Sequence, residues 1–418
     1  MVRKIISTFF SKFTSAGISF LLLLITARFL GTEIRGEISL FVLGLAIIQT
    51  INEIVCGPAL VYIIPQSDIR SITKLVYVWV FMATGITVGV LYLFGLLNTN
   101  WLPHISLLAL LMAFTSFHQQ ALLAGEKITA YNILSLIPPL LLITSICFFI
   151  FYLQKKSFNS YLYCVYISQI PAFLIGVFYL KNLWKLPGKE YSASHAKILL
   201  KNGLFNQVAN IAHLFSNRIN YYLLGAFAVV GVYSTGVSVI ESVWIISQSV
   251  AVILLSRIVN SNDKQQSQQT SLQLARVCSL LSFMGILVLC CLPLRFYEWV
   301  LGQQYSEIKP VLVLLGPGIL CISFSTILCN YFAGTGKNFI ITLANFSGFI
   351  ITFIAAIFLI PGYGMKGAAV ATSISYFCSS LFLLIVFKNE TGLKLKEFIP
   401  GTRDLIFMQQ QLKNLLKK

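Results

Sequence analysis

Apolar segments of about 20 residues recur along the whole length of this 418-residue chain. A segment of that size is what an α-helix needs to cross a hydrocarbon core roughly 30 Å thick. We count about twelve segments, centred near residues 18, 50, 84, 112, 140, 168, 212, 244, 284, 320, 349 and 377. Their length, and the Gly and Pro inside them, favour helices, because barrel strands would alternate over roughly ten residues. The sequence therefore predicts an all-α polytopic membrane protein.

The composition agrees with a bilayer as the main solvent. Hydrophobic residues make up 57% of the chain and charged residues 10%, whereas a soluble domain carries about 25% charged residues. The first apolar segment follows Arg3 and Lys4, but it is too long for a signal peptide and lacks a small-residue cleavage site. We interpret it as the first span. The nine cysteines form no C-x-x-C pair, and we expect unpaired thiols, mostly buried.

The basic residues behind the net charge of +17 concentrate in the loops of one side of the membrane. We therefore do not interpret this charge as a sign of a nucleic-acid partner. With twelve spans, the two ends and the even-numbered loops hold 22 of the 30 Lys and Arg, and the odd-numbered loops hold seven. Positive residues concentrate on the cytoplasmic side of membrane proteins. The distribution therefore predicts that both termini and the loop from Lys181 to Lys201 are cytoplasmic.

That basic loop divides the spans into two sets of six. "GTEIRG" (Gly31 to Gly36) is echoed by "GVYSTG" (Gly231 to Gly236), and Ala124-Gly125 is echoed by Ala333-Gly334. An even number of spans in each half makes the two halves a parallel repeat. We expect an N-lobe at residues 1–185, a C-lobe at 186–388 and a basic cytoplasmic tail at 389–418, which should lie on anionic lipid.

A row of polar residues interrupts the seventh span. On a helix with about 100° per residue, six side chains fall within an arc of about 80°, and the opposite face is apolar. One or two polar groups would suit hydrogen bonding between helices, but six along one span suit the wall of a water-filled cavity better. The six are Asn202, Asn206, Asn210, His213, Asn217 and Asn220, and we call them the polar stripe. All of them except Asn202 are candidate substrate-binding residues, because amides and imidazole offer both donors and acceptors.

Three charged residues lie inside the spans: Glu53, Arg218 and Glu241. An ionisable group in lipid costs at least about 2.5 kcal/mol and usually serves function. Arg218 is the candidate anchor for an anionic substrate, because a guanidinium grips two oxygens at once. Its alternative role is a structural ion pair with Glu241 or Glu53. The two Glu are candidates for ion coupling.

The chain resembles the O-antigen (Wzx-type) polysaccharide flippases of the multidrug/oligosaccharidyl-lipid/polysaccharide exporter superfamily. The resemblance rests on "ARFLGTEIRGEISLF" (Ala27 to Phe41), "VGVYSTG" (Val230 to Gly236) and "IPGYGMKGAAVATSISY" (Ile360 to Tyr376). It implies two six-helix lobes around a central cavity, alternating access, and an oligosaccharide on an undecaprenyl pyrophosphate carrier as substrate. In this family Asp often stands where this chain has Asn220, which weakens a coupling role for that position.

The resemblance therefore implies a flippase of the bacterial inner membrane, with lipid-linked oligosaccharide, membrane lipids and other polysaccharide-assembly proteins as partners. The first alternative is a cation-coupled multidrug exporter, but a site for organic cations should be acidic and aromatic. The second is a membrane-embedded polysaccharide enzyme, but the sequence offers no paired acid and base and no metal-ligand spacing. We expect no catalytic residues, no metal and no cofactor. "GYGMKG" (Gly362 to Gly367) lies between two spans and is not a nucleotide site.

Overall fold

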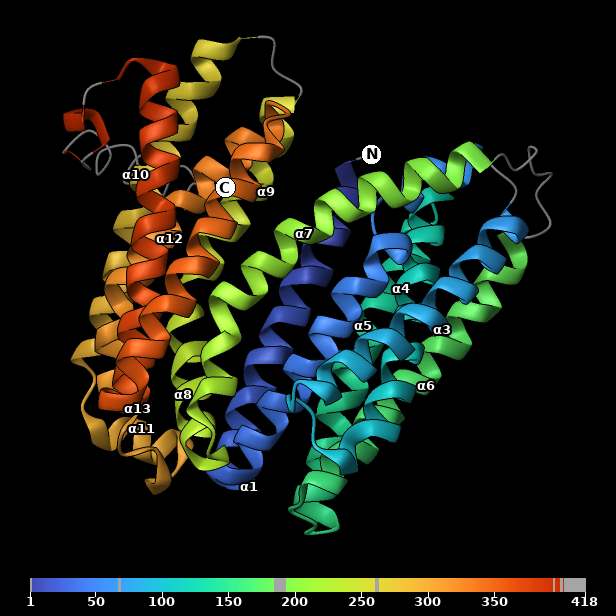
Figure 1. The fold of residues 1–418 in the computed structure, drawn as a ribbon, viewed down its shortest axis with the longest axis horizontal. Helices are drawn as coiled ribbons and strands as arrows, with labels where there is room; N and C mark the ends of the chain where they lie inside the picture. The colour runs from blue at the N-terminus through green and yellow to red at the C-terminus, as the bar shows by residue number, and fades with distance from the viewer. Residues whose placement is uncertain are drawn as a thin grey trace. The chain divides into compact units, whose positions relative to one another are not determined.

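A computed structural model describes residues 2–66, 69–183, 193–259, 263–393, 395–398 and 401 of the chain. Every regular element in this part is helical (Figure 1), which confirms the all-α prediction. The chain divides into two compact units, Met1–Ile211 and Ala212–Lys418. The division expected from the sequence, between residues 185 and 186, falls among residues that the structure does not describe, and it stays a prediction.

Unit 1 is a bundle of long helices. Its elements are α1 Val2–Cys56, α2 Leu60–Ile63, η1 Ile64–Gln66, α3 Ile69–Leu93, η2 Thr99–Trp101, α4 Leu102–Ala124, α5 Ile128–Cys147, the π-helical turn η3 Phe148–Tyr152 and α6 Phe158–Leu183. Helix α1 packs against α3, α4 and α5, and α6 packs against α4 and α5 (Figure 1). The buried side of the bundle is apolar, as expected where lipid surrounds the helices.

Unit 2 is built around helices α10 to α13. Helix α7, Ala193–Leu224, begins in unit 1 and ends in unit 2. The other elements are α8 Phe227–Glu241, α9 Trp244–Val259, α10 Lys264–Cys291, α11 Leu294–Leu301, η4 Gln303–Tyr305, α12 Ile308–Gly334, α13 Asn338–Thr391 and η5 Leu395–Phe398. Helix α12 contacts α8, α9, α10 and α13 and is therefore the central helix of this unit.

The described part contains eight helices long and apolar enough to cross a membrane, or nine when α8 and α9 count as one span bent by 47°. Helices α1 and α13 hold 55 and 54 residues, and each contains one non-helical residue, Gly31 and Gly364. At about 1.5 Å per residue each is far longer than one hydrocarbon core. The chain is a multi-pass membrane protein, and the expected count of twelve spans is not confirmed.

The turns after α4 and α12 have the same backbone geometry. The amides of Gly125, Glu126 and Lys127 donate to the carbonyls of Ala121, Leu123 and Leu122 at 2.9–3.0 Å. The amides of Thr335, Gly336 and Lys337 donate to the carbonyls of Tyr331, Ala333 and Phe332 at 2.8–3.1 Å, in the same order. This repeat therefore pairs Gly125 with Thr335, one position away from the pairing expected from the sequence.

The other echo expected from the sequence pairs the wrong glycine. Gly231 lies inside α8, whereas the chain turns at Gly225, which has a φ of +73°. In unit 1 the corresponding break is at Gly31, with a φ of +82°. Only glycine enters this left-handed region without steric cost. We therefore infer that Gly31 corresponds to Gly225 rather than to Gly231.

The break inside α13 gives a first prediction. Gly364 has a φ of +54° and a ψ of −131°, whereas Gly362, two residues earlier, has open space around the position of a Cβ atom and no positive φ. Gly364→Ala should cost about 1–3 kcal/mol of unfolding free energy, the range for a strained backbone. Gly362→Ala is the matched control and should change it little. Thermal unfolding of both variants in detergent measures the difference, and equal melting temperatures would contradict the prediction.

Candidate substrate site on α7

Helix α7 carries the polar stripe, and the structure describes only part of it. Asn202 and Asn206 lie on the helix, but their side chains are outside the described residues. The Asn210 side chain is exposed, and its Nδ2 donates to Gln207 Oε1 at 2.9 Å. The predicted cavity-facing role of Asn206 and Asn210 stays a prediction.

The next two stripe residues hydrogen-bond to each other. Asn217 Nδ2 lies 3.1 Å from His213 Nε2. Because an amide nitrogen can only donate, the imidazole Nε2 accepts. The His213 ring also lies against Trp244 of α9, with 6.1 Å between ring centroids, and Trp244 Nε1 donates to Thr326 Oγ1 of α12 at 2.7 Å. His213 therefore contacts Trp244 of α9 as well as Asn217 one turn further along α7.

The last stripe residue, Asn220, is fully buried inside unit 2. Its Nδ2 lies within hydrogen-bond distance of the Ala368 carbonyl at 3.1 Å, Thr372 Oγ1 at 2.8 Å and Tyr233 Oη at 3.4 Å. These contacts join α7 to α8 and α13. In this conformation Asn220 forms hydrogen bonds between helices. Such bonding is the alternative to a cavity wall that the sequence leaves for polar residues of the stripe. A substrate role for Asn220 stays a prediction that requires another conformation.

The exposure of the α7 side chains gives a second prediction. Asn210 is exposed on the polar face, Val208 is exposed on the apolar face, and Asn220 is buried. In a cysteine-free background, we expect Asn210→Cys to react with a charged, membrane-impermeant thiol reagent at least tenfold faster than Val208→Cys, because lipid excludes such a reagent. Asn220→Cys should react as slowly as Val208→Cys. Equal rates at positions 210 and 208 would refute a water-exposed polar face.

Arg218 forms a two-pronged ion pair with Glu241. Its Nη1 donates to Oε1 at 3.0 Å and its Nη2 to Oε2 at 2.5 Å. The side chains are 25% and 13% exposed, so the pair is largely removed from solvent. The structure therefore contains the ion pair that was the alternative role of Arg218, and its partner is Glu241. Glu241, one of the two candidates for ion coupling, is therefore neutralised by a guanidinium in this structure.

Two tyrosines that no sequence motif indicates, Tyr221 and Tyr376, complete this cluster. The Arg218 guanidinium carbon lies 5.5 Å from the centroid of the Tyr221 ring, within the range of a cation–π contact. Tyr376 Oη donates to Glu241 Oε1 at 3.5 Å. Tyr221 stands three residues after Arg218, so helical spacing could have indicated it. Tyr376 comes from α13, and no spacing on α7 points to it.

Glu53 stands near the end of α1 in unit 1. It is half-buried, and it has no hydrogen bond or ion pair with any residue whose side chain the structure describes. Its neighbour Asn52 is fully buried and donates to Thr84 Oγ1 of α3 at 3.0 Å. The structure therefore gives the two candidate carboxylates different surroundings, and only Glu241 is held by an arginine.

The cluster combines one permanent cation, the carboxylate paired with it, and the amides of the polar stripe. A guanidinium that binds a carboxylate through two parallel N–H groups can bind two phosphate oxygens in the same way. Asn side chains supply both donors and acceptors, which match sugar hydroxyls. No group of three or more His, Cys, Asp or Glu that could hold a metal occurs among the described residues.

Comparison with known proteins gives two relatives by sequence, while no known family profile matches the chain. The capsular polysaccharide biosynthesis protein CapF of Staphylococcus aureus is 25% identical over 286 residues, which is 64% of this chain and 67% of that protein. A protein of Haloferax volcanii named as a probable low-salt glycan biosynthesis flippase, Agl15, is 23% identical over 197 residues. That match spans 45% of this chain and 41% of the relative, so it covers less than half of Agl15.

Solved structures resemble the chain over nearly its whole length. The lipid II flippase MurJ, in an inward closed conformation, has a TM-score of 0.74 at 14% identity, over 94% of this chain and 89% of its own. An inward-facing multidrug resistance MATE family transporter has a TM-score of 0.69 at 14% identity, over 91% and 94%. The chain therefore has the fold of the multidrug/oligosaccharidyl-lipid/polysaccharide exporter superfamily, and its expected resemblance to the polysaccharide flippases of that superfamily is confirmed.

Proposed function

We propose that this chain flips an undecaprenyl-pyrophosphate-linked oligosaccharide across the bacterial inner membrane, for the assembly of a surface polysaccharide such as O-antigen or capsule. Flipping would proceed by alternating access, with both termini in the cytoplasm. The names of the two sequence relatives, one for capsular polysaccharide and one for a glycan flippase, support a lipid-linked glycan as the substrate. The fold supports transport without catalysis.

The observation that carries the proposal is the Arg218–Glu241 pair. A pyrophosphate crossing a membrane must lose most of its water, which is prohibitive unless the protein supplies charge and donors in exchange. Arg218 offers both, and its two-pronged grip on Glu241, at 3.0 and 2.5 Å, shows that it can hold two oxygens at once. In our proposal the substrate pyrophosphate takes the place of Glu241 on the guanidinium.

Direct exchange of the Glu241 carboxylate for the substrate pyrophosphate avoids the cost of breaking the Arg218–Glu241 pair before the substrate binds. Breaking a buried pair without a replacement leaves an uncompensated charge and typically costs 3–5 kcal/mol. When pyrophosphate replaces the carboxylate, Arg218 stays paired throughout. Glu241 is then the group without a partner, and in this proposal it binds the coupling cation at that moment. Glu53 remains a second candidate for the same role in unit 1.

The stripe residues that precede Arg218 on α7 would bind the sugar. Asn210 is exposed, and His213 and Asn217 hydrogen-bond to each other, so each of these bonds can be exchanged for one to a sugar hydroxyl at little net cost. Asn206 continues the same face by helical spacing. Because amides and hydroxyls pair in many geometries, these residues would tolerate different sugars, while the pyrophosphate contact would be common to all substrates.

Reconstitution tests the proposal. The purified protein is placed in liposomes that contain a fluorescent undecaprenyl-pyrophosphate-linked oligosaccharide, and a membrane-impermeant quencher reports the molecules that reach the outer leaflet. We expect protein-dependent flipping, and we expect the same oligosaccharide on a monophosphate carrier to move at least tenfold more slowly. Export of ethidium, measured in the same liposomes, is the matched test of a multidrug exporter.

Two results would overturn the proposal. Ethidium transport without movement of the lipid-linked oligosaccharide would assign the chain to drug export instead. Equal rates for pyrophosphate and monophosphate carriers would remove the pyrophosphate contact as the determinant of recognition, even if the glycan still moves.

A further inference from the structure

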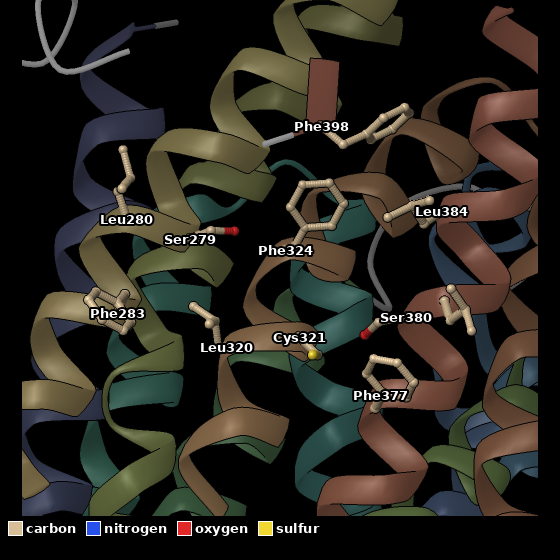
Figure 2. Close-up of a pocket in the computed structure, with 11 residues that line it drawn as sticks. Ser279, Leu280, Phe283, Leu320, Cys321, Phe324, Phe377, Ser380, Leu384 and Phe398 are labelled. Carbon is tan, nitrogen blue, oxygen red and sulfur yellow. The ribbon is translucent and has the colours of Figure 1, made fainter. Parts of the chain in front are cut away.

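Three helices and a short turn of unit 2 line an open apolar cavity of about 460 Å³ (Figure 2). The walls come from α10, α12 and the second half of α13, and Phe398 of η5 closes one end. The Phe398 ring lies 6.4 Å from the Phe324 ring and 6.1 Å from the Phe387 ring, and the residue is 7% exposed. The residues that surround the cavity are Ser279, Leu280, Phe283, Leu320, Cys321, Phe324, Phe377, Ser380, Leu381, Leu384 and Phe398.

The lining presents almost no polar group to an occupant. Ser279 Oγ donates to the Ala275 carbonyl at 2.8 Å, and Ser380 Oγ donates to Ser325 Oγ at 3.0 Å. Both hydroxyl protons therefore point into the protein, and the Cys321 thiol is only a weak donor, so a sugar or peptide would lack strong hydrogen-bond partners. Water is a poor occupant as well, because it needs two or more polar partners. The lining chemistry fits a hydrocarbon chain.

The cavity opens toward the surroundings of the helices. Phe283, Phe377 and Leu381 line it and are 52%, 53% and 42% exposed. They belong to α10 and α13, which together with α12 are long and apolar enough to span a membrane. Exposed apolar side chains on membrane-spanning helices face lipid tails, so an acyl chain can enter the cavity from the bilayer without crossing water.

Basic residues stand at the end of the cavity where Phe398 lies. Arg276 precedes Ser279 by one turn of α10, Lys388 follows Leu384 by one turn of α13, and Lys396 is two residues before Phe398. Arg276 Nη1 donates to the Glu397 carbonyl at 2.9 Å, which fixes η5 on α10.

Two acidic residues lie in the same region, Glu390 and Glu397. Glu390 is occupied, because Lys337 Nζ lies 2.7 Å from its Oε2 and Tyr331 Oη donates to its Oε1 at 3.1 Å. Among the residues that the structure describes here, Arg276, Lys388 and Lys396 outnumber Glu397, which makes this rim positively charged. Each Lys or Arg near a membrane surface attracts anionic lipid by about 1 kcal/mol.

We propose that this cavity is a binding site for one anionic phospholipid of the surrounding bilayer, with an acyl chain inside it and the phosphodiester at the rim formed by Arg276, Lys388 and Lys396. The site lies wholly in unit 2 and is separate from the Arg218 cluster. It adds a lipid ligand to the protein whatever substrate the protein moves. Negatively charged lipid should therefore occupy the cavity in preference to zwitterionic lipid.

Photolabelling of the full chain in liposomes tests this site. The probes are phosphatidylglycerol and phosphatidylcholine, each with a diazirine at the end of one acyl chain, and mass spectrometry locates the labelled peptides. We expect phosphatidylglycerol to label the lining segments of α10, α12 and α13 at least fivefold more than phosphatidylcholine. Exposed apolar positions elsewhere, such as Phe81 of α3, should be labelled equally by both.

Two matched pairs of variants separate the chain contact from the headgroup contact. Cys321→Phe fills the cavity and should abolish the phosphatidylglycerol excess, while Cys291→Phe, at an exposed position outside the lining, should keep it. Lys396→Gln should lower the excess about fivefold, the effect of one basic residue at a membrane surface, while Lys366→Gln should not. Lys396 and Lys366 are exposed, so these two variants test the site even if Cys321→Phe does not fold.

Equal labelling of the lining by the two probes would overturn the proposal. So would displacement of the phosphatidylglycerol probe by unlabelled undecaprenyl phosphate but not by unlabelled phosphatidylglycerol, because the cavity would then hold an isoprenoid tail. Neither result depends on whether the protein flips an oligosaccharide.

Discussion

Arg218→Ala should abolish flipping of the lipid-linked oligosaccharide while the protein still accumulates in the membrane. Truncating one member of a desolvated charge pair costs about 2–5 kcal/mol, which corresponds to a loss of at least about thirtyfold in rate. Arg218→Lys keeps the charge but loses the two-pronged geometry seen with Glu241, so partial activity is expected. Surface polysaccharide in cells and flipping in liposomes both measure the effect.

The controls for Arg218 separate substrate binding from structure. Arg295→Ala removes an exposed arginine at the start of α11 and should leave flipping unchanged. If Arg218 only stabilises the fold through Glu241, then Arg218→Ala should fail to accumulate, and Arg218→Ala combined with Glu241→Ala should restore both accumulation and flipping. Restored flipping in that double variant, or normal polysaccharide from Arg218→Ala alone, would remove Arg218 as the substrate anchor.

Gly203→Ala should destabilise unit 1 and lower flipping with it. A Cβ atom at Gly203 of α7 would overlap the carbonyl of Ile54 near the end of α1, and a backbone carbonyl cannot rotate away as a side chain can. Overpacking typically costs 1–3 kcal/mol, and the close approach of backbone to backbone puts Gly203→Ala at or above the top of that range. Thermal unfolding in detergent and the amount of protein in the membrane measure the effect.

Gly85→Ala is the matched control for Gly203. Gly85 lies on the membrane-spanning helix α3, and nothing lies within 4 Å of a Cβ atom at that position. Alanine should be neutral there or slightly stabilising, because it favours the helix over glycine by up to about 1 kcal/mol. If Gly203→Ala and Gly85→Ala unfold at the same temperature, the contact between α7 and α1 does not require glycine.

The all-α fold was predictable because lipid restricts the choice of structure. A chain with apolar segments of about 20 residues must satisfy its backbone groups within each segment, so helices follow directly. The number of spans was harder to predict. Helix α7, expected as the seventh span, is not among the helices of the described part that are long and apolar enough to cross a membrane, and α8 and α9 are separated by a break near residue 244, where the sequence had suggested one continuous segment.

The candidate site was predictable along one helix and not between helices. Helical spacing places Asn210, His213 and Asn217 on one face, and that argument needs only the angle per residue. The partners of Arg218 and Asn220 come from α8 and α13, up to 152 positions away in the case of Thr372. Spacing within α7 cannot say which helix packs against it, so one sequence could name Glu241 only as one of two candidates.

The sequence match between the two halves was likewise unable to identify which glycine makes the turn. "GTEIRG" and "GVYSTG" match as letters, yet the residue that matters at each position is the one whose φ is positive. Gly225, with its φ of +73°, has no counterpart in that match. A turn is recognised by its backbone angles, and several glycines close together leave its position ambiguous by a few residues.

Glu241 is the last residue of α8, and the 47° bend toward α9 begins immediately after it. The carboxylate that holds Arg218 is therefore fixed to the vertex of an angle rather than to the middle of a straight rod. Helix α9 has 16 residues, so it extends about 24 Å from this vertex, and a rotation of about 10° there would displace its far end by about 4 Å. The ion pair therefore lies at the bend between α8 and α9, where a small rotation moves the far end of α9 by several ångströms.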